Sequence, residues 1–144
     1  MQKSLKYNRN RGIDWQDAPD VKKRVGVLLD KLDNVGFNKV RIFCFRSTSA
    51  RTRAIARIWG FSKIWQLALR QKPAYVIEVI SEKFDYLPEK DKDSVLLHEI
   101  AHIPNNFSGA LVPHIRRGKR NFYNRVKRLV AYTKVKRLIS LNNR

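Results

Sequence analysis

Apolar residues recur at helical spacing in three stretches of this 144-residue chain. Residues 14–33 have this spacing, which predicts an amphipathic helix with Pro19 in its first turn. A second helix is predicted from Pro88 to just before Pro104, because the residue that precedes a proline avoids the helical region. A third is predicted over residues 121–141. Its inner stripe consists of Phe122, Val126, Leu129, Val130 and Thr133.

Strand patterns lie between the first two predicted helices. Residues 39–46 are rich in β-branched and aromatic side chains, residues 53–59 alternate, and residues 74–80 form the clearest strand. Residues 63–69 fit either a strand or a short helix, and residues 81–87 are expected to form a loop. We expect an α+β fold, with a small, mostly antiparallel sheet packed against the three helices.

Length and composition are typical of one globular domain. Hydrophobic residues make up 43% of the chain, which predicts one domain over residues 13–144 after a basic arm at 1–12. The single cysteine, Cys44, lies in an apolar run and is expected to be a buried thiol. The sequence shows neither a signal peptide nor an apolar run of about 20 residues, so we expect a cytoplasmic protein with no membrane association.

All three histidines lie within 17 residues, and two of them belong to the sequence His98-Glu99-Ile100-Ala101-His102. His98 and His102 are one helical turn apart, so both rings can reach one ion. Glu99 lies about 100° around the helix from His98, where its carboxylate can take a proton from a water held by the metal. This pattern is the signature of zinc peptidases.

A catalytic zinc ion needs a third protein ligand and one open position. No Asp or Glu follows Glu99, and the remaining histidine is His114. The 11 residues between His102 and His114 are enough to bring the chain back once Pro104 ends the helix. We therefore predict one Zn²⁺ per chain, held by the three histidines.

The sequence also resembles the phage-type metallopeptidase family, in which a strand, a His-Glu-x-x-His-Ile-Pro helix and a Gly-x-x-x-Pro-His segment occur in this order. The resemblance rests on residues 56–60, 75–81, 84–85, 95–104 and 109–114. More distantly, the chain resembles the Spartan/SprT-like minimal zinc proteases. The resemblance implies a zincin-like minimal fold and a zinc endopeptidase that acts on a protein or peptide substrate. It also implies His98, His102 and His114 as ligands and Glu99 as general base.

Further site residues are candidates only. A donor that stabilises the transition state could be Tyr123, Arg116 or Arg117, and the sequence does not choose between them. Asp85 or Glu82 could orient a ligand histidine. Such proteases usually bind substrate as an added strand beside the edge of their sheet, and residues 74–80 are the best candidate for the strand near the site.

The net charge of +19 is unevenly distributed, because the chain after Glu99 contains 11 Lys and Arg and no carboxylate. Such a surface attracts polyanions, so we expect DNA or RNA to bind the basic C-terminal helix and the segment before it. The candidate contacts are Lys119, Arg120, Arg125, Lys127, Arg128, Lys134, Lys136 and Arg137. Trp59 and Trp65 could stack on bases, but tryptophan at strand spacing is more typical of a core, which we expect for both.

Two alternatives to a protease remain open. One is a basic nucleic-acid-binding protein with a structural or vestigial metal site, and the other is a zinc-dependent nuclease. A structural zinc normally has a fourth protein ligand, which only Cys44 or a carboxylate could supply here. The sequence does not predict the natural substrate or the oligomeric state.

Overall fold

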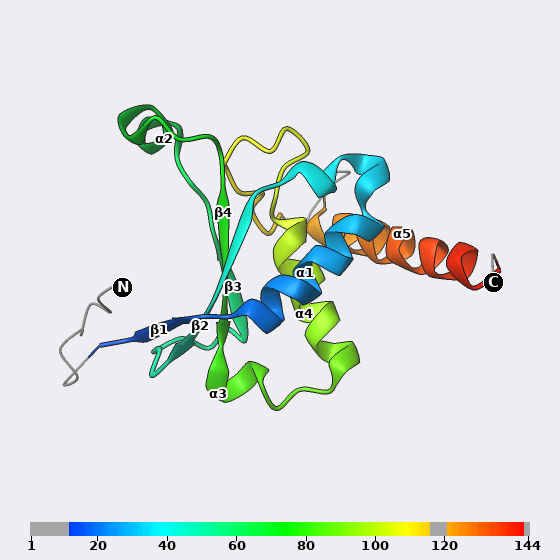
Figure 1. The fold of residues 1–144 in the computed structure, drawn as a ribbon, viewed down its shortest axis with the longest axis horizontal. Coiled ribbons are helices and arrows are strands. Elements are labelled where there is room, and N and C mark those ends of the chain that lie inside the picture. Colours follow the sequence, from blue (N-terminus) through cyan, green and yellow to red (C-terminus); the bar gives the residue numbers. More distant parts are fainter. Residues whose placement is uncertain (1–11, 116–120, 143–144) are drawn as a thin grey trace.

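The computed structural model describes residues 12–115 and 121–142 (Figure 1). The predicted basic arm therefore lies outside the described residues except for Gly12. The strands are β1 (Asp14–Asp17), β2 (Ile42–Thr48), β3 (Ala56–Trp59) and β4 (Tyr75–Ile80). The α-helices are α1 (Pro19–Lys31), α2 (Lys63–Leu69), α3 (Ser81–Phe84), α4 (Glu89–Ala101) and α5 (Phe122–Asn142). Two 3₁₀ turns, η1 (Asp33–Val35) and η2 (Phe37–Lys39), join α1 to β2.

The four strands form one sheet in the order β1-β2-β4-β3. β1 is antiparallel to β2 and β3 is antiparallel to β4, whereas the central pair β2 and β4 is parallel. Helices α1, α4 and α5 lie on one side of this sheet (Figure 1). The predicted α+β class with a mostly antiparallel sheet is confirmed.

Several predicted element boundaries were wrong. Residues 14–17 form an edge strand instead of the start of the first helix, because Pro19 sets the first turn of α1 and the backbone before it pairs with β2. The expected loop at residues 81–87 begins with the short helix α3. For residues 63–69, where the sequence fits either a strand or a short helix, the structure has the helix α2. The core positions expected for Trp59 and Trp65 are also wrong, since both side chains are exposed.

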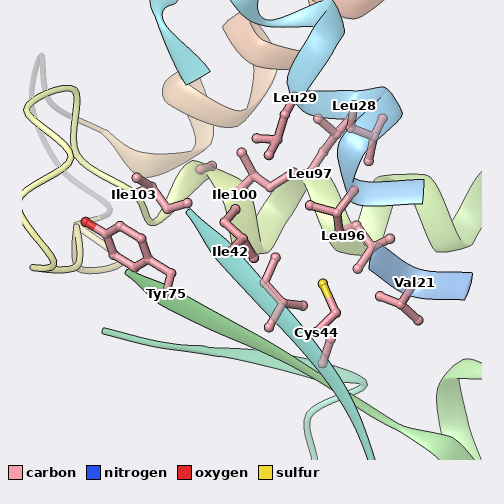
Figure 2. Packing of buried hydrophobic residues seen from close by; sticks show 14 of the residues in the cluster. Val21, Leu28, Leu29, Ile42, Cys44, Tyr75, Leu96, Leu97, Ile100 and Ile103 are labelled. Carbon is pink, nitrogen blue, oxygen red and sulfur yellow. The ribbon is translucent and has the colours of Figure 1, made fainter. Parts of the chain in front are cut away.

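The core lies between the sheet and the helices α1 and α4 (Figure 2). Alternate β-strand side chains such as Ile42 and Ile77 point into it, where they meet Leu28 of α1 and Leu96 and Ile100 of α4. Cys44 belongs to the same core, as predicted. Burial raises the pKa of its thiol to about 11, so it stays protonated and unreactive at neutral pH.

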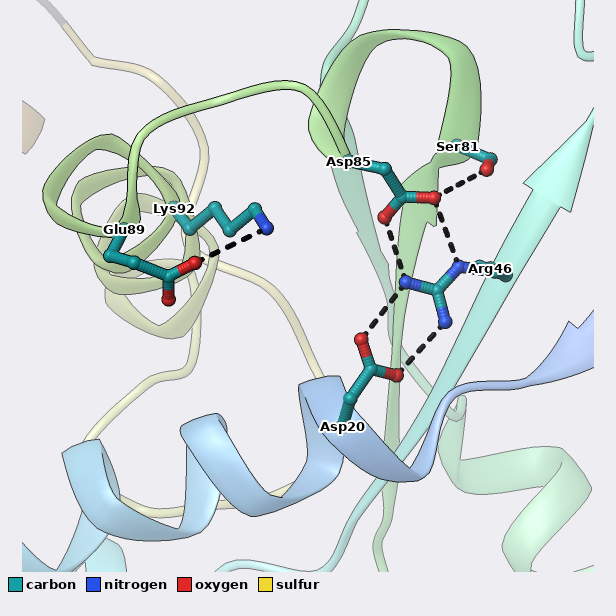
Figure 3. A network of polar contacts seen from close by, with 6 residues as sticks. All are labelled: Asp20, Arg46, Ser81, Asp85, Glu89 and Lys92. Carbon is teal, nitrogen blue, oxygen red and sulfur yellow. Dashed lines mark hydrogen bonds and ion pairs between the residues drawn. The ribbon is translucent and has the colours of Figure 1, made fainter.

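A polar network ties the start of α1 to the two central strands (Figure 3). Both nitrogens at the end of the Arg46 side chain bond to Asp20, at 2.9 and 3.0 Å. The same guanidinium bonds to Asp85 at 2.7 and 3.3 Å, and the hydroxyl of Ser81 donates to Asp85. Such bidentate Arg–carboxylate pairs are geometrically specific. They hold α1 against β2 and the segment after β4.

None of the helices in the described residues combines the length and the apolar character needed to cross a bilayer.

Candidate active site

The three histidines, which come from two separate segments, meet at the end of α4. His98 lies in the last turns of this helix, His102 caps its C-terminus, and His114 lies in the connection from α4 to α5. Each ring offers one nitrogen to the group, and these three nitrogens all lie within 4.8 Å of one another. The Nε2 atoms of His98 and His114 are 3.1 Å apart. The structure thus brings together every histidine that the sequence singles out.

These three imidazoles fit a divalent metal ion. Two nitrogens bound about 2.0–2.1 Å from a tetrahedral ion lie about 3.3–3.4 Å apart, close to the separation of His98 and His114. Burial is the main reason that the pKa values of His98 and His102 are lowered, and the neighbouring histidines lower them further. Both rings are therefore neutral at neutral pH and keep a lone pair for a metal.

A backbone carbonyl orients His102. Its Nδ1 lies 2.6 Å from the carbonyl oxygen of Val112, which leaves Nε2 free to face the other histidines. The carboxylates considered for this role are engaged elsewhere. Asp85 bonds to Arg46, and Glu82 accepts a hydrogen bond from the backbone N–H of Ser49.

The loop that carries His114 is anchored to the sheet at Gly109. Its N–H donates to the hydroxyl of Tyr75, and that hydroxyl donates in turn to the carbonyl of Ala110. Gly109 has a φ of +92°, and a Cβ there would lie 2.2 Å from the carbonyl oxygen of Phe61. Only glycine fits both conditions. The loop therefore closes against the sheet and places His114 opposite α4.

Phe122, the first residue of α5, forms the packed wall behind the three imidazoles. Its ring stacks on that of His102, with the two centroids 4.4 Å apart. It also makes T-shaped contacts with the rings of His98 and His114, at centroid distances of 5.1 and 4.7 Å. The sequence indicated Phe122 as a residue of the inner stripe but not as part of the site. No spacing rule links it to the histidines, because the contact depends on how α5 crosses α4.

Glu99 directly follows His98 on α4, and its carboxylate lies against β3. Its side chain is buried, and the backbone N–H of Ile58 donates to its carboxylate. Burial raises the pKa of Glu99 to about 7, although the hydrogen bond from Ile58 opposes this change. A carboxyl group with a pKa near neutrality can both accept and return a proton at physiological pH.

A cleft of about 460 Å³ opens beside Glu99. Its lining includes His98, Glu99 and His114 on one side and residues 54–56, at the start of β3, on the other. β3 is an edge strand, whereas β4 has a neighbour on each side. The expectation that residues 74–80 would be the strand near the site is therefore wrong, since β3 borders the cleft.

The backbone of β3 presents hydrogen-bonding groups to this cleft. Ile80 donates to the carbonyl of Ile55, so these two residues form a hydrogen-bonded pair of the antiparallel ladder. Such pairs alternate, which directs the backbone groups of Arg57 toward β4 and those of Ala56 and Ile58 toward the free edge. The bond from Ile58 to Glu99 agrees with this direction.

Arg125 closes the C-terminal end of α4. Its Nε donates to the carbonyl of Ala101 at 2.6 Å, and its Nη2 donates to the carbonyl of Ile103. These carbonyls flank His102. Arg125 was predicted to contact nucleic acid, but its guanidinium is part-buried and bound within the fold.

The remaining predicted residues are only partly described. Lys127, Arg128, Lys134 and Tyr123 are exposed on α5. Residues Arg116, Arg117, Lys119 and Arg120 lie outside the described residues, as do the side chains of Lys136 and Arg137. Tyr123 directly follows Phe122, which packs against the histidines. Its role as a transition-state stabiliser stays a prediction.

Comparison with known proteins adds one match. The family model described as "Putative phage metallopeptidase" matches residues 13–143. The matched range includes all three histidines and nearly the whole chain. No curated protein and no solved structure matches the chain.

Proposed function

Because the chain belongs to the family described as putative phage metallopeptidases, we propose that it is a zinc-dependent endopeptidase with Glu99 as its general base. The observation that carries this proposal is one juxtaposition. Three imidazoles converge beside a buried carboxylate, and His98, His114 and Glu99 line the same open cleft. One Zn²⁺ per chain, held by His98, His102 and His114, would complete the site.

When bound, the metal would polarise the scissile carbonyl and make a water molecule acidic enough to lose a proton near neutral pH. The chain itself supplies the proton transfer. Glu99 is positioned to accept the proton and to return it to the leaving amine, in the manner of a general base that becomes a general acid. The bond from Ile58 holds the carboxylate in place while its protonation state changes.

We infer that the peptide substrate binds along the free edge of β3. The outward backbone groups of Ala56 and the carbonyl of Ile58 would pair with an extended segment by β-augmentation. This pairing recognises the main chain, so it suits a protease with broad side-chain tolerance. Tyr123, Arg116 and Arg117 remain the candidates for stabilising the developing oxyanion.

The open cleft favours catalysis over a purely structural metal. A structural zinc site is closed by a fourth protein ligand, and the metal-binding group found among the described residues contains only the three histidines. Cys44, the alternative ligand considered from the sequence, is buried in the core. The basic charge leaves a zinc nuclease as the second candidate, so nucleic-acid cleavage belongs in the test.

The decisive experiment compares the zinc-loaded chain with Glu99→Gln and with the control Asp91→Asn, which alters an exposed carboxylate on the same helix. Metal content, cleavage of an unfolded protein and cleavage of DNA and RNA are measured for each. We expect one zinc ion in all three chains. Proteolysis should persist in Asp91→Asn and fall by about 10²–10⁴-fold in Glu99→Gln. Equal proteolysis by Glu99→Gln would exclude the assigned base, and metal-dependent cleavage of nucleic acid alone would favour the nuclease.

A further inference from the structure

The face of the sheet turned away from α1 and α4 carries exposed aromatic residues in register. Phe43 of β2 and Trp59 of β3 both pair with Val76 of β4, so the three residues form one row across the sheet. Strand spacing places Phe43 and Trp59 about 9–10 Å apart. Their exposed fractions are 43% and 48%. Trp15 of β1 lies on the same face, because it pairs with Ser47, and is 53% exposed.

Trp59 is exposed but anchored. Its indole N–H donates to the carboxylate of Glu78 at 2.9 Å, and Arg57 bonds to the same carboxylate at 2.7 and 3.1 Å. The guanidinium of Arg57 also lies 4.9 Å from the centre of the Trp59 ring. Glu78 is itself fully buried, so its position is fixed. An aromatic ring held in this way loses little conformational freedom when a ligand stacks on it.

Cations surround the other aromatic position. The Nζ of Lys22 lies 5.5 Å from the centre of the Phe43 ring, and the guanidinium of Arg41 lies 5.7 Å from it. The sequence contains no carboxylate between Asp33 and Glu78, and Glu78 is neutralised by Arg57. Asp17 of β1 is an exposed carboxylate in a neighbouring row, opposite Phe45. The row from Phe43 to Trp59 therefore combines exposed rings with a positive surrounding.

From this arrangement we propose that the row from Phe43 to Trp59, on the face of the sheet turned away from α4, binds single-stranded nucleic acid. Bases would stack on Trp59 and Phe43, and the phosphates would lie near Arg41 and Lys22. Stacking of unpaired bases on aromatic rings within a basic surface is the general mode for single strands. A duplex keeps its bases stacked internally, so it cannot use these rings. This surface is separate from the cleft, and the inference does not depend on the peptidase activity.

The test measures binding of a fluorescein-labelled 20-nucleotide oligothymidylate by fluorescence anisotropy, with a hairpin duplex as comparison, at fixed moderate salt. Phe43→Ala and Trp59→Phe are the test variants. Trp65→Ala, which removes an exposed tryptophan of α2, is the matched control. The double variant Lys127→Gln/Arg128→Gln tests the alternative route through α5.

We expect Phe43→Ala to weaken binding of the single strand by about fivefold or more and Trp65→Ala to change it less than twofold. Saturation with oligonucleotide should quench tryptophan fluorescence in the native chain. Trp59→Phe, which keeps a ring but loses the bond to Glu78, should bind less tightly and show less quenching. Thermal unfolding of each variant checks that the fold is retained. Peptide hydrolysis by Phe43→Ala is expected to be unchanged, which separates this inference from the proposed peptidase.

Three results would overturn the inference. One is the absence of binding to the single strand by the native chain. Another is native-like affinity in both Phe43→Ala and Trp59→Phe. The third is duplex binding that equals single-strand binding and is lost only in the Lys127/Arg128 double variant, which would place the nucleic acid on α5.

Discussion

His102 and Val112 are joined by two hydrogen bonds that run in opposite directions. The Nδ1 of His102 lies 2.6 Å from the carbonyl oxygen of Val112, and the N–H of Val112 donates to the carbonyl of His102 at 2.6 Å. This exchange ties the end of α4 to the segment that carries His114, two residues further along. These two bonds therefore fix the ring orientation of His102 and the backbone position near His114.

The first prediction concerns the tautomer of His102. Because a carbonyl can only accept, Nδ1 must carry the proton, and Nε2 is left unprotonated. A long-range ¹H–¹⁵N NMR spectrum of the metal-free chain at neutral pH should therefore show the Nδ1–H form for His102. Observation of the Nε2–H form would mean that the bond to Val112 does not exist in solution.

Phe122 should matter for both stability and metal binding. It is fully buried and touches all three imidazoles, so Phe122→Ala should lower the free energy of unfolding by about 3–5 kcal/mol. The same change should weaken zinc affinity, since the rings lose their packed wall. Chemical unfolding and zinc titration measure these effects. Tyr123→Ala, which alters the exposed neighbour, is the control and should change stability by less than about 1 kcal/mol.

Arg125 should act as a cap on α4. Arg125→Met removes the donors to the carbonyls of Ala101 and Ile103 and should cost about 1.5–3 kcal/mol of unfolding free energy. Arg128→Met, on the exposed side of α5, removes the same charge without these bonds. Urea unfolding of the two variants gives the comparison. If Arg128→Met were as destabilising as Arg125→Met, net charge and not capping would explain the loss.

The Arg46 network should make stability depend on pH. The hydrogen bond from Arg46 lowers the pKa of Asp20. At Asp85, burial acts to raise the pKa of the carboxyl group, but the hydrogen bonds from Arg46 and Ser81 outweigh burial. The pKa of Asp85 is therefore lowered as well. Groups whose folded pKa is lowered stabilise the protein above their unfolded pKa, and this contribution is lost as the pH falls through the folded value.

The unfolding free energy of the native chain should therefore fall as the pH is lowered from about 5 toward 2. Arg46→Gln should be less stable at neutral pH, and its deficit should shrink over the same range. Arg41→Gln is the control, because Arg41 donates to the carbonyl of Lys72 and not to a carboxylate. Urea unfolding at several pH values tests this, and a deficit of Arg46→Gln that stays constant with pH would contradict it.

Much of the site was predictable because its signals are local. The spacing of His98 and His102 follows from helix geometry, and Pro104 and Gly109 mark where the chain turns back to His114. The strand at β4 was equally clear, because its apolar residues are nearly continuous.

The parts that sequence reasoning missed depend on tertiary context. Residues 14–17 carry no strand pattern of their own and form β1 because the backbone of β2 is available beside them. The role of β3 as the edge at the cleft depends on sheet order, which periodicity does not encode. Trp59 looked like a core residue, and only the register shows it on the face of the sheet turned away from α4.

X-ray absorption at the zinc edge of the zinc-loaded chain shows whether the three histidines hold the metal. We expect a first shell of three imidazole nitrogens and one oxygen from solvent, all at about 2.0–2.1 Å. His114→Ala should lose one imidazole from this shell. A shell containing sulfur or a fourth protein ligand, or a spectrum that does not change in His114→Ala, would contradict this assignment.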